Sequence, residues 1–444
     1  MIDTTQDSRY GFYYYPDTAH YRENDALRWV PELRALGAGW LTLLASTERA
    51  IPENFLKPLL DADIQPIIHL PLPTSISGLT DEVGVFCEAY AHWGVKYIAF
   101  FDRPNQSKNW DAVAWVQKNL VERFIDKFIP LAKAAIGLGL TPIFPPLEPG
   151  GNYWDTAFLF SALQAIQRKG HEDILERLAL SAYAWAGNRS PDWGAGGPER
   201  WPTAQPYETP INSEDQLGFR IFDWYLAITQ AAIGKTLPIV LLGAGSKIGD
   251  QSDLRSSSVD AQTHATQNMA IMRMLQGQNK DYEAVPPEVL ASNFWVLSAE
   301  QDDPESQNAW YLHGREHLPV VGMLKEWVAR SAQDKFASPK FISTATSNYF
   351  NPHTIAHYLL LPTFEWGPAD WHLDAIRPFI YKYQPTIGFS PMEASHAKKV
   401  TVIGGATAVP ESIIDGLLAA GCIVEQISGD GMNIASKLTS RSTD

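Results

Sequence analysis

The sequence predicts an α/β protein that begins with a (β/α)8 barrel and ends with a small open-sheet α/β domain. Eight short apolar segments alternate with helical patterns, and Gly and Pro residues stand at the junctions between them. Most of these segments are continuous apolar runs, as expected for parallel strands that are covered on both faces. The 444-residue chain is long enough for both parts. We expect the barrel over residues 1–338 and the second domain over residues 339–444.

The barrel elements follow from these patterns in chain order. The expected strands are residues 10–15, 40–44, 66–70, 95–101, 140–144, 178–185, 237–242 and 292–297. Helical periodicity predicts helices at residues 26–36, 54–62, 111–137, 154–169, 217–233 and 261–275. The connection over residues 186–216 is long and rich in Gly, Pro and aromatic residues. Long loops in compact domains are usually functional, so we expect a lid or a cleft wall there.

The second domain shows the same alternation on a smaller scale. Apolar runs predict strands at residues 355–362, 400–403 and 422–427, and the intervening patterns predict helices at 370–383, 410–420 and 431–440. The middle strand ends in Gly404-Gly405, a turn whose amides are able to bind an anion or simply to turn the chain. A dinucleotide site is not expected, because no G-x-G-x-x-G motif with a downstream acid is present.

Composition excludes several classes of function. The chain has 35 Lys+Arg against 50 Asp+Glu, a formal charge of −15, which gives no electrostatic basis for binding nucleic acid. No apolar run approaches the roughly 18 residues that a membrane span requires, so no membrane insertion is expected. The 2 cysteines and the scattered histidines predict neither a metal site nor a cofactor. The 15 tryptophans are unusual and suit a scaffold that presents aromatic surfaces.

The N-terminal residues carry no recognisable secretory signal. We therefore expect a soluble protein that stays inside the cell, or one found at the cell surface or outside it if a signal has been removed.

The ends of the predicted strands carry the motifs that bear on function, since barrel enzymes place their functional residues there. The fourth strand ends in Asp102-Arg103-Pro104-Asn105, and the seventh contains Pro238-Ile239-Val240-Leu241-Leu242-Gly243-Ala244-Gly245. The eighth ends in Asn293-Phe294-Trp295-Val296. In order and spacing, these segments resemble the strand ends of clan A glycoside hydrolases, which end strand four in Asn-Glu-Pro-Asn and carry a nucleophilic Glu on strand seven.

The resemblance implies a glycosidase barrel, but both catalytic positions differ. The acid/base Glu of the family corresponds to Arg103 and the nucleophilic Glu to Gly243. Retaining hydrolysis needs two carboxyl groups about 5–5.5 Å apart. Arginine stays protonated near neutral pH and glycine has no side chain, so we expect retaining hydrolysis to be lost.

Two other carboxylates are candidates for hydrolysis. Glu148 follows the fifth strand and Asp102 ends the fourth, and a pair at wider spacing suits inverting hydrolysis. The alternative for Asp102 is an ion pair with Arg103 or a cap on the following segment, and the alternative for Glu148 is to accept hydrogen bonds from loop amides.

Aromatic residues at the strand ends predict carbohydrate binding, because sugar faces stack on aromatic rings while the hydroxyls need polar partners. Ordinary core packing is the alternative for each of these rings. The candidate binding residues are Tyr13, Tyr15, Asn105, Trp110, Trp154, Trp185, Trp193 and Trp295.

Residues 399–431 resemble a single cell-wall-binding repeat type 2 of bacterial surface proteins, although these repeats usually occur in threes and continue Gly-x-Asp-Arg-Tyr, whereas Gly431-Met432 follow Asp430. The resemblance implies cell-wall polysaccharide as a partner. We therefore expect a bacterial, glycan-recognising pseudoenzyme on a glycosidase-like barrel. The alternatives are an active hydrolase that uses Glu148 and Asp102, and a structural or assembly protein in which the barrel supplies only surface.

Overall fold

The computed structural model divides into two compact units, Met1–Pro339 and Lys340–Asp444. Each unit is described by itself. The residues that the structure describes are 8–75, 80–206, 208–279, 281–312, 316–336, 355–362, 376, 379–380, 385–405, 408–428 and 437.

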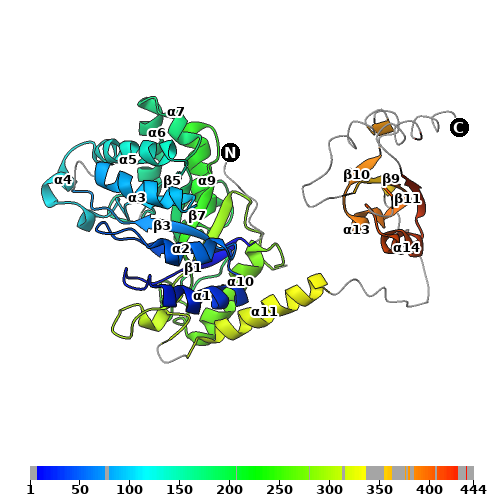
Figure 1. Ribbon diagram of the computed structural model, residues 1–444. Coiled ribbons are helices and arrows are strands. Elements are labelled where there is room, and N and C mark those ends of the chain that lie inside the picture. Colours follow the sequence, from blue (N-terminus) through cyan, green and yellow to red (C-terminus); the bar gives the residue numbers. More distant parts are fainter. Residues whose placement is uncertain are drawn as a thin grey trace. The chain divides into compact units, whose positions relative to one another are not determined.

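The first unit is an eight-stranded parallel barrel, which confirms the predicted fold class (Figure 1). The sheet order is β5-β4-β3-β2-β1-β8-β7-β6, and a parallel bridge between Ile143 and Ala179 joins its two ends. The strands are β1 (Tyr10–Tyr13), β2 (Trp40–Leu44), β3 (Gln65–Leu70), β4 (Tyr97–Phe100), β5 (Thr141–Ile143), β6 (Leu180–Trp185), β7 (Ile239–Gly245) and β8 (Val289–Phe294).

Helices surround the strands, and most lie where periodicity predicts them. The larger helices are α1 (Glu23–Ala35), α2 (Glu53–Leu60), α3 (Thr80–His92), α5 (Leu120–Gly137), α6 (Asp155–Arg168), α9 (Ile221–Ile233), α10 (Ala261–Leu275) and α11 (Pro319–Phe336). Three are short: α4 (Ala112–Val116), α7 (Glu172–Leu175) and α8 (Gly197–Arg200). Sequence patterns miss α3 and α11.

The predicted helix over residues 111–137 is wrong as a single element, since the structure has α4 and α5 there. Asn119 has a left-handed backbone with φ of 61° and cannot continue a right-handed helix. The new helix then buries Val121, Phe124 and Phe128, which recur at intervals of three and four residues.

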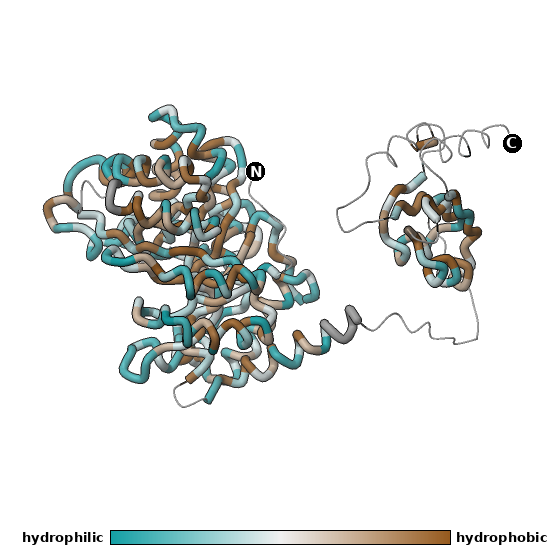
Figure 2. The backbone as a smooth tube through the Cα atoms, in the orientation of Figure 1, coloured by the Kyte–Doolittle hydropathy of each residue, from teal (hydrophilic) through white to brown (hydrophobic). Residues whose placement is uncertain are grey.

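Two apolar layers explain why the strands are continuous hydrophobic runs. One lies between the strands and the helices and includes Phe12, Leu41 and Phe100. The other fills the barrel and includes Trp40, Tyr97 and Val240. Hydrophobic segments accordingly run through the middle of this unit (Figure 2). Because consecutive side chains of a strand point to opposite faces, both must be apolar.

The second unit contains a four-stranded parallel sheet of order β10-β9-β11-β12. Its elements are β9 (Ile355–Leu360), β10 (Thr386–Gly388), α13 (Pro391–Ala394), β11 (Ala397–Ile403), α14 (Glu411–Ala419) and β12 (Ile423–Ile427). The patterns miss β10 and α13, and the helices expected at 370–383 and 431–440 fall almost entirely outside the described residues. The amide of Gly404 donates to the carbonyl of Ile427 at 2.9 Å, so this amide continues the pairing of β11 with β12.

Across the described ranges, no helix has the length and apolar character that a membrane span requires.

Candidate functional site

A strained turn after β4 brings two charged side chains to the carboxyl end of the barrel. Phe101 and Arg103 have φ of 64° and 45°, left-handed values that are rare for residues with side chains. The Arg103 amide donates to the carbonyl of Pro146, 2.9 Å away, which ties this turn to the segment after β5. Strain of this kind persists only where the surrounding structure holds it, and it often marks functional sites.

Asn105 fixes the same two segments from below the surface. Its side chain is fully buried, donates to the carbonyls of Glu148 and Tyr153 at 2.9 and 3.0 Å, and accepts from the Glu148 amide at 2.9 Å. These contacts use its polar atoms within the protein. Asn105 therefore positions Glu148 and does not face the solvent as a sugar ligand.

Arg103 forms ion pairs with both candidate carboxylates. Its Nε lies 2.9 Å from Oε2 of Glu148, and its Nη1 lies 3.6 Å from Oδ2 of Asp102. The expected pairing of Asp102 with Arg103 is thus present, whereas the side chain of Glu148 contacts the guanidinium. Burial disfavours the charged guanidinium, but the surrounding tyrosine and carboxylate oxygens outweigh burial and raise the pKa of Arg103.

Tyr183 and Trp185 from β6 continue this cluster. The Tyr183 hydroxyl donates to Oδ1 of Asp102 at 2.8 Å, and the guanidinium carbon of Arg103 lies 4.3 Å from the Tyr183 ring centre. The rings of Tyr183 and Trp185 are nearly parallel, at 9°, with centres 5.5 Å apart. Alternate residues of a strand point to the same face, which is why these two rings lie together.

Lys247 is a second half-buried cation, and it follows β7. Its ammonium nitrogen lies 4.3 Å from the ring centre of Trp185 and 4.8 Å from that of Trp295. Glu305 lies 3.5 Å from this nitrogen and accepts a hydrogen bond from the Trp295 indole at 2.7 Å. Burial lowers the pKa of Lys247. Burial would raise the pKa of Glu305, but Lys247 and the hydrogen-bond donors around the carboxylate outweigh it, so this pKa is lowered as well.

His69 and Tyr13 lie beneath these rings and are hydrogen-bonded to each other. Nε2 of His69 lies 3.1 Å from the Phe101 carbonyl, which only accepts, so Nε2 carries the proton and Nδ1 accepts from the Tyr13 hydroxyl at 3.2 Å. Burial lowers the pKa of His69. This arrangement holds a neutral imidazole.

The space above Gly243 is occupied by aromatic rings. A Cβ atom at this position would lie 2.9 Å from Trp185, 3.1 Å from Tyr183 and 3.2 Å from Trp295. These distances are shorter than ordinary van der Waals contacts, so a side chain here would force the neighbouring rings to shift. The position that resembles the family's nucleophile therefore has no room for a carboxylate unless these rings move.

A cavity of about 310 Å³ opens beside this cluster. Gly187 and Arg189, within the predicted cleft wall over residues 186–216, line it together with residues from the neighbouring loops. The full lining is Glu148, Pro149, Tyr183, Trp185, Gly187, Arg189, Leu217, Gly218, Asp250 and Ser252.

The buried carboxyl group of Asp155 fastens two walls of this cavity. It accepts from the Gly150 amide at 3.0 Å, from the Gln216 side chain at 3.1 Å and from the Tyr225 hydroxyl at 3.2 Å. Gly150 follows Glu148 and Pro149, and Gln216 precedes Leu217, so the contacts join loops that line the cavity. Burial raises the pKa of Asp155 despite these donors.

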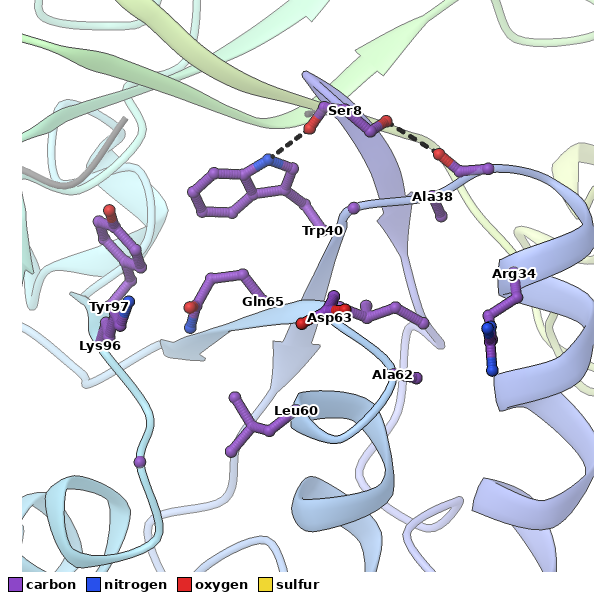
Figure 3. A pocket seen from close by; sticks show the side chains of 14 residues that line it. Ser8, Arg34, Ala38, Trp40, Leu60, Ala62, Asp63, Gln65, Lys96 and Tyr97 are labelled. Carbon is purple, nitrogen blue, oxygen red and sulfur yellow. Dashed lines mark hydrogen bonds between the residues drawn. The ribbon is translucent and has the colours of Figure 1, made fainter. Parts of the chain in front are cut away.

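A larger cavity, of about 600 Å³, lies at the opposite end of the barrel, where the strands begin (Figure 3). Trp40 and Tyr97 line it with ring centres 5.3 Å apart, and both side chains are almost fully buried. The Trp40 indole donates to the Ser8 carbonyl at 3.0 Å. Barrel enzymes carry function at the carboxyl end and stability at the amino end, so we place the candidate site at the smaller cavity.

The structure brings only some of the expected residues to that cavity. Glu148 and Trp185 line it. Asp102, Trp295 and Trp193 lie outside the lining but contact lining residues, namely Tyr183, Trp185 and Arg189, respectively. Tyr13, Tyr15 and Trp110 are buried in apolar clusters, and Trp154 is half-buried outside the lining.

Several polar residues of the site were not among the expected ones. Tyr183 is an inward-facing strand residue and was hidden within an apolar run, whereas Arg189, Lys247, Asp250 and Glu305 lie two or more residues beyond strand ends. The signal available in the sequence was that charged residues, such as Arg189 and Glu305, follow Trp185 and Trp295 along the chain. Among the described residues, no three His, Cys, Asp or Glu side chains form a potential metal site.

No protein-family model and no curated protein sequence matches the chain at a significant level. Solved structures do resemble it. A family 39 glycoside hydrolase from Bacteroides cellulosilyticus WH2 has a TM-score of 0.47 and 13% identity, covering 73% of this chain and 64% of that chain. The chain thus spans less than two thirds of that structure's length.

Two further likenesses cover nearly the whole of the other protein. An endo-β-1,3-glucanase of family 128, subgroup II, from Sorangium cellulosum has a TM-score of 0.41 and 10% identity over 71% of this chain and 97% of that chain. A D-allulose 3-epimerase from a Methylomonas species, in complex with D-allulose, has a TM-score of 0.39 and 10% identity over 73% of this chain and 96% of that chain. At these identities the likeness concerns the fold alone.

Proposed function

We propose that this barrel binds carbohydrate at the cavity beside Trp185 and does not hydrolyse it. The observation that carries the proposal is the position of Arg103, which is paired with both Asp102 and Glu148. The carboxylates that would have to perform hydrolysis are already engaged by a cation of the protein.

Retaining hydrolysis lacks its two groups. Arg103 cannot act as a general acid near neutral pH, because its pKa is raised above an already high value. Gly243 supplies no nucleophile, and the rings of Trp185 and Tyr183 fill the space where a side chain would project. Both halves of the double displacement are therefore missing at the usual positions.

Inverting hydrolysis by Asp102 and Glu148 meets a different obstacle. A general acid must donate a proton to the leaving oxygen, and the general base must face a water molecule. Both carboxylates instead form ion pairs with Arg103, and Asp102 also accepts a hydrogen bond from the Tyr183 hydroxyl. Hydrolysis would require these contacts to break first.

The cavity suits recognition of a sugar. Tyr183 and Trp185 give it an aromatic surface, while the carboxylates of Glu148 and Asp250 and the hydroxyl oxygen of Ser252 supply acceptors. An apolar wall with a few fixed polar groups is the usual composition of a small-molecule site. The aromatic contact contributes area and stacking, and the polar groups select the orientation of the hydroxyls.

We propose cell-wall polysaccharide as the first class of glycan to test. Its support is the resemblance of residues 399–431 to one cell-wall-binding repeat, in which β11, the turn at Gly404 and α14 have the strand–glycine–helix order. This part of the proposal concerns the second unit and is separable from sugar binding by the barrel.

Binding of the full chain to a glycan array that includes bacterial cell-wall polysaccharides tests the proposal. We expect binding to a defined set of glycans, weakened about tenfold or more by Trp185→Ala. Trp93→Ala is the matched control, because Trp93 is also half-buried but lies at the opposite end of the barrel, four residues before β4 begins at Tyr97. Absence of binding to every glycan would favour a structural or assembly role and reject the proposal.

A further inference from the structure

We infer that the cavity beside Trp185 selects sugars that carry a positively charged amino group, with Asp250 as the specificity-determining residue. This inference rests on the proposed function, because it names the class of carbohydrate that the same cavity prefers. The inference depends on which charged side chains of the cavity already form ion pairs within the protein.

Three charged side chains line the cavity, and two of them have an ion-pair partner within the protein. Glu148 lies 2.9 Å from Nε of Arg103. Arg189 has Nη1 3.6 Å from Oδ1 of Asp215, and the same nitrogen donates to the Leu217 carbonyl at 2.6 Å. A ligand that engages either group must compete with an existing ion pair.

Asp250 is the third, and its charge is not matched by a cation in the part of the chain that the structure describes. Its Oδ1 accepts from the amide and the hydroxyl of Ser252, at 2.8 and 2.5 Å. These are neutral donors from its own turn, which fix the carboxylate without cancelling its charge. The half-buried carboxylate therefore remains the negative group of the cavity that is available to a ligand.

The backbone holds Asp250 close to the aromatic wall. Gly187 follows Trp185 by two residues, has φ of 59°, and would place a Cβ atom 3.2 Å from Oδ1 of Asp250. A side chain at this position would push the carboxylate away from β6. Asn188 fastens the same loop by donating to the carbonyls of Asp253 and Ser257 at 2.7 and 3.1 Å.

A carboxylate beside an aromatic wall distinguishes an amino sugar from its neutral counterpart. Both ligands offer the apolar face that packs on a ring, but only the protonated amine forms a charge-assisted hydrogen bond with Asp250. A hydrogen bond to a charged group contributes more than one between neutral groups. We expect the amino sugar to bind about tenfold more tightly than the matching neutral sugar at low ionic strength.

Titration of the full chain with matched monosaccharides, followed by tryptophan fluorescence, tests the inference. The probes are glucosamine, galactosamine and mannosamine, each beside its neutral hexose and its N-acetylated form, at a pH of about 6, where the free amine is protonated. The expected result is a preference for the free amines that N-acetylation removes and that added salt weakens.

Asp250→Asn is the decisive variant. Asparagine keeps an Oδ1 atom that accepts from Ser252, so the turn is preserved while the charge is removed. We expect this variant to bind neutral sugars as the wild type does and to lose the preference for amines. Asp281→Asn is the matched control, because it makes the same change of net charge at an exposed residue that precedes β8.

The outcomes separate this inference from the proposed function. Equal binding of neutral and amino sugars, or a preference that survives in Asp250→Asn, would overturn the inference and leave sugar binding intact. Binding of no sugar by the wild type would overturn the proposed function and the inference with it.

Discussion

The two ends of the barrel differ in what their cavities contain. The amino end has the larger volume, about 600 Å³, but Trp40 and Tyr97 are packed into the core and Trp40 is bonded to the backbone of Ser8. The carboxyl end has about 310 Å³, with the strained residue Arg103, two carboxylates and partly accessible rings beside it. Volume alone would select the amino end, whereas the charged groups and the strained residue that often mark functional sites lie at the carboxyl end.

The largest expected effect on stability is at the amino end of the barrel. Trp40→Ala removes an almost fully buried indole, so we expect the free energy of unfolding to fall by about 3–5 kcal/mol. Chemical denaturation measures the loss, and sugar binding by the folded fraction should be unchanged. If Trp40→Ala abolished sugar binding and left stability nearly intact, the amino-end cavity would be the site.

A smaller effect is expected at the carboxyl end from Arg103→Gln. This change leaves Asp102 and Glu148 without their shared cation, and because all three side chains are partly exposed we expect a loss of about 1–3 kcal/mol. Salt screens ion pairs between partly exposed groups, so the loss should shrink as the ionic strength rises. A loss that is the same at low and high salt, measured by urea unfolding, would contradict this electrostatic account.

The smallest effect concerns Asp155, which fastens the cavity walls. Its folded pKa is raised above 3.8, so its contribution to stability is complete below that pH and is lost as the pH rises through the folded pKa. Asp155→Asn does not titrate, and its amide is able to accept from Gly150 and donate to Tyr225. Relative to this variant, the wild type should lose stability as the pH rises, and urea unfolding across pH detects the trend.

A constant difference between wild type and Asp155→Asn, or one that moves in the wild type's favour as the pH rises, would show that folding does not raise the pKa of Asp155.

The barrel was predictable because most strands are apolar runs and helical patterns separate most neighbouring strands. The helix α3 was missed, as Gly84 and alternating polar residues weaken its periodicity, and the break before α5 depends on the single left-handed residue Asn119. Local sequence does not reveal such a backbone conformation, because asparagine also occurs within helices.

The candidate site was predictable in part. Trp185 ends β6, and Arg103 and Glu148 lie in the loops that follow β4 and β5, where barrel geometry places functional residues. Tyr15 shows the limit of that rule, since its ring packs against His20 and Trp29 in the space between strands and helices. To identify Lys247 and Asp250 as site residues, the path of the loop after β7 must be known, and a single sequence does not define that path.

The central claim is that the barrel binds sugar without hydrolysing it, and a turnover assay tests this most directly. The glycans that the array selects are incubated with the full chain, and released reducing ends are measured beside Glu148→Gln. The account predicts no turnover above the uncatalysed rate for either protein. Clear hydrolysis by the wild type that Glu148→Gln abolishes would contradict it and identify an active hydrolase.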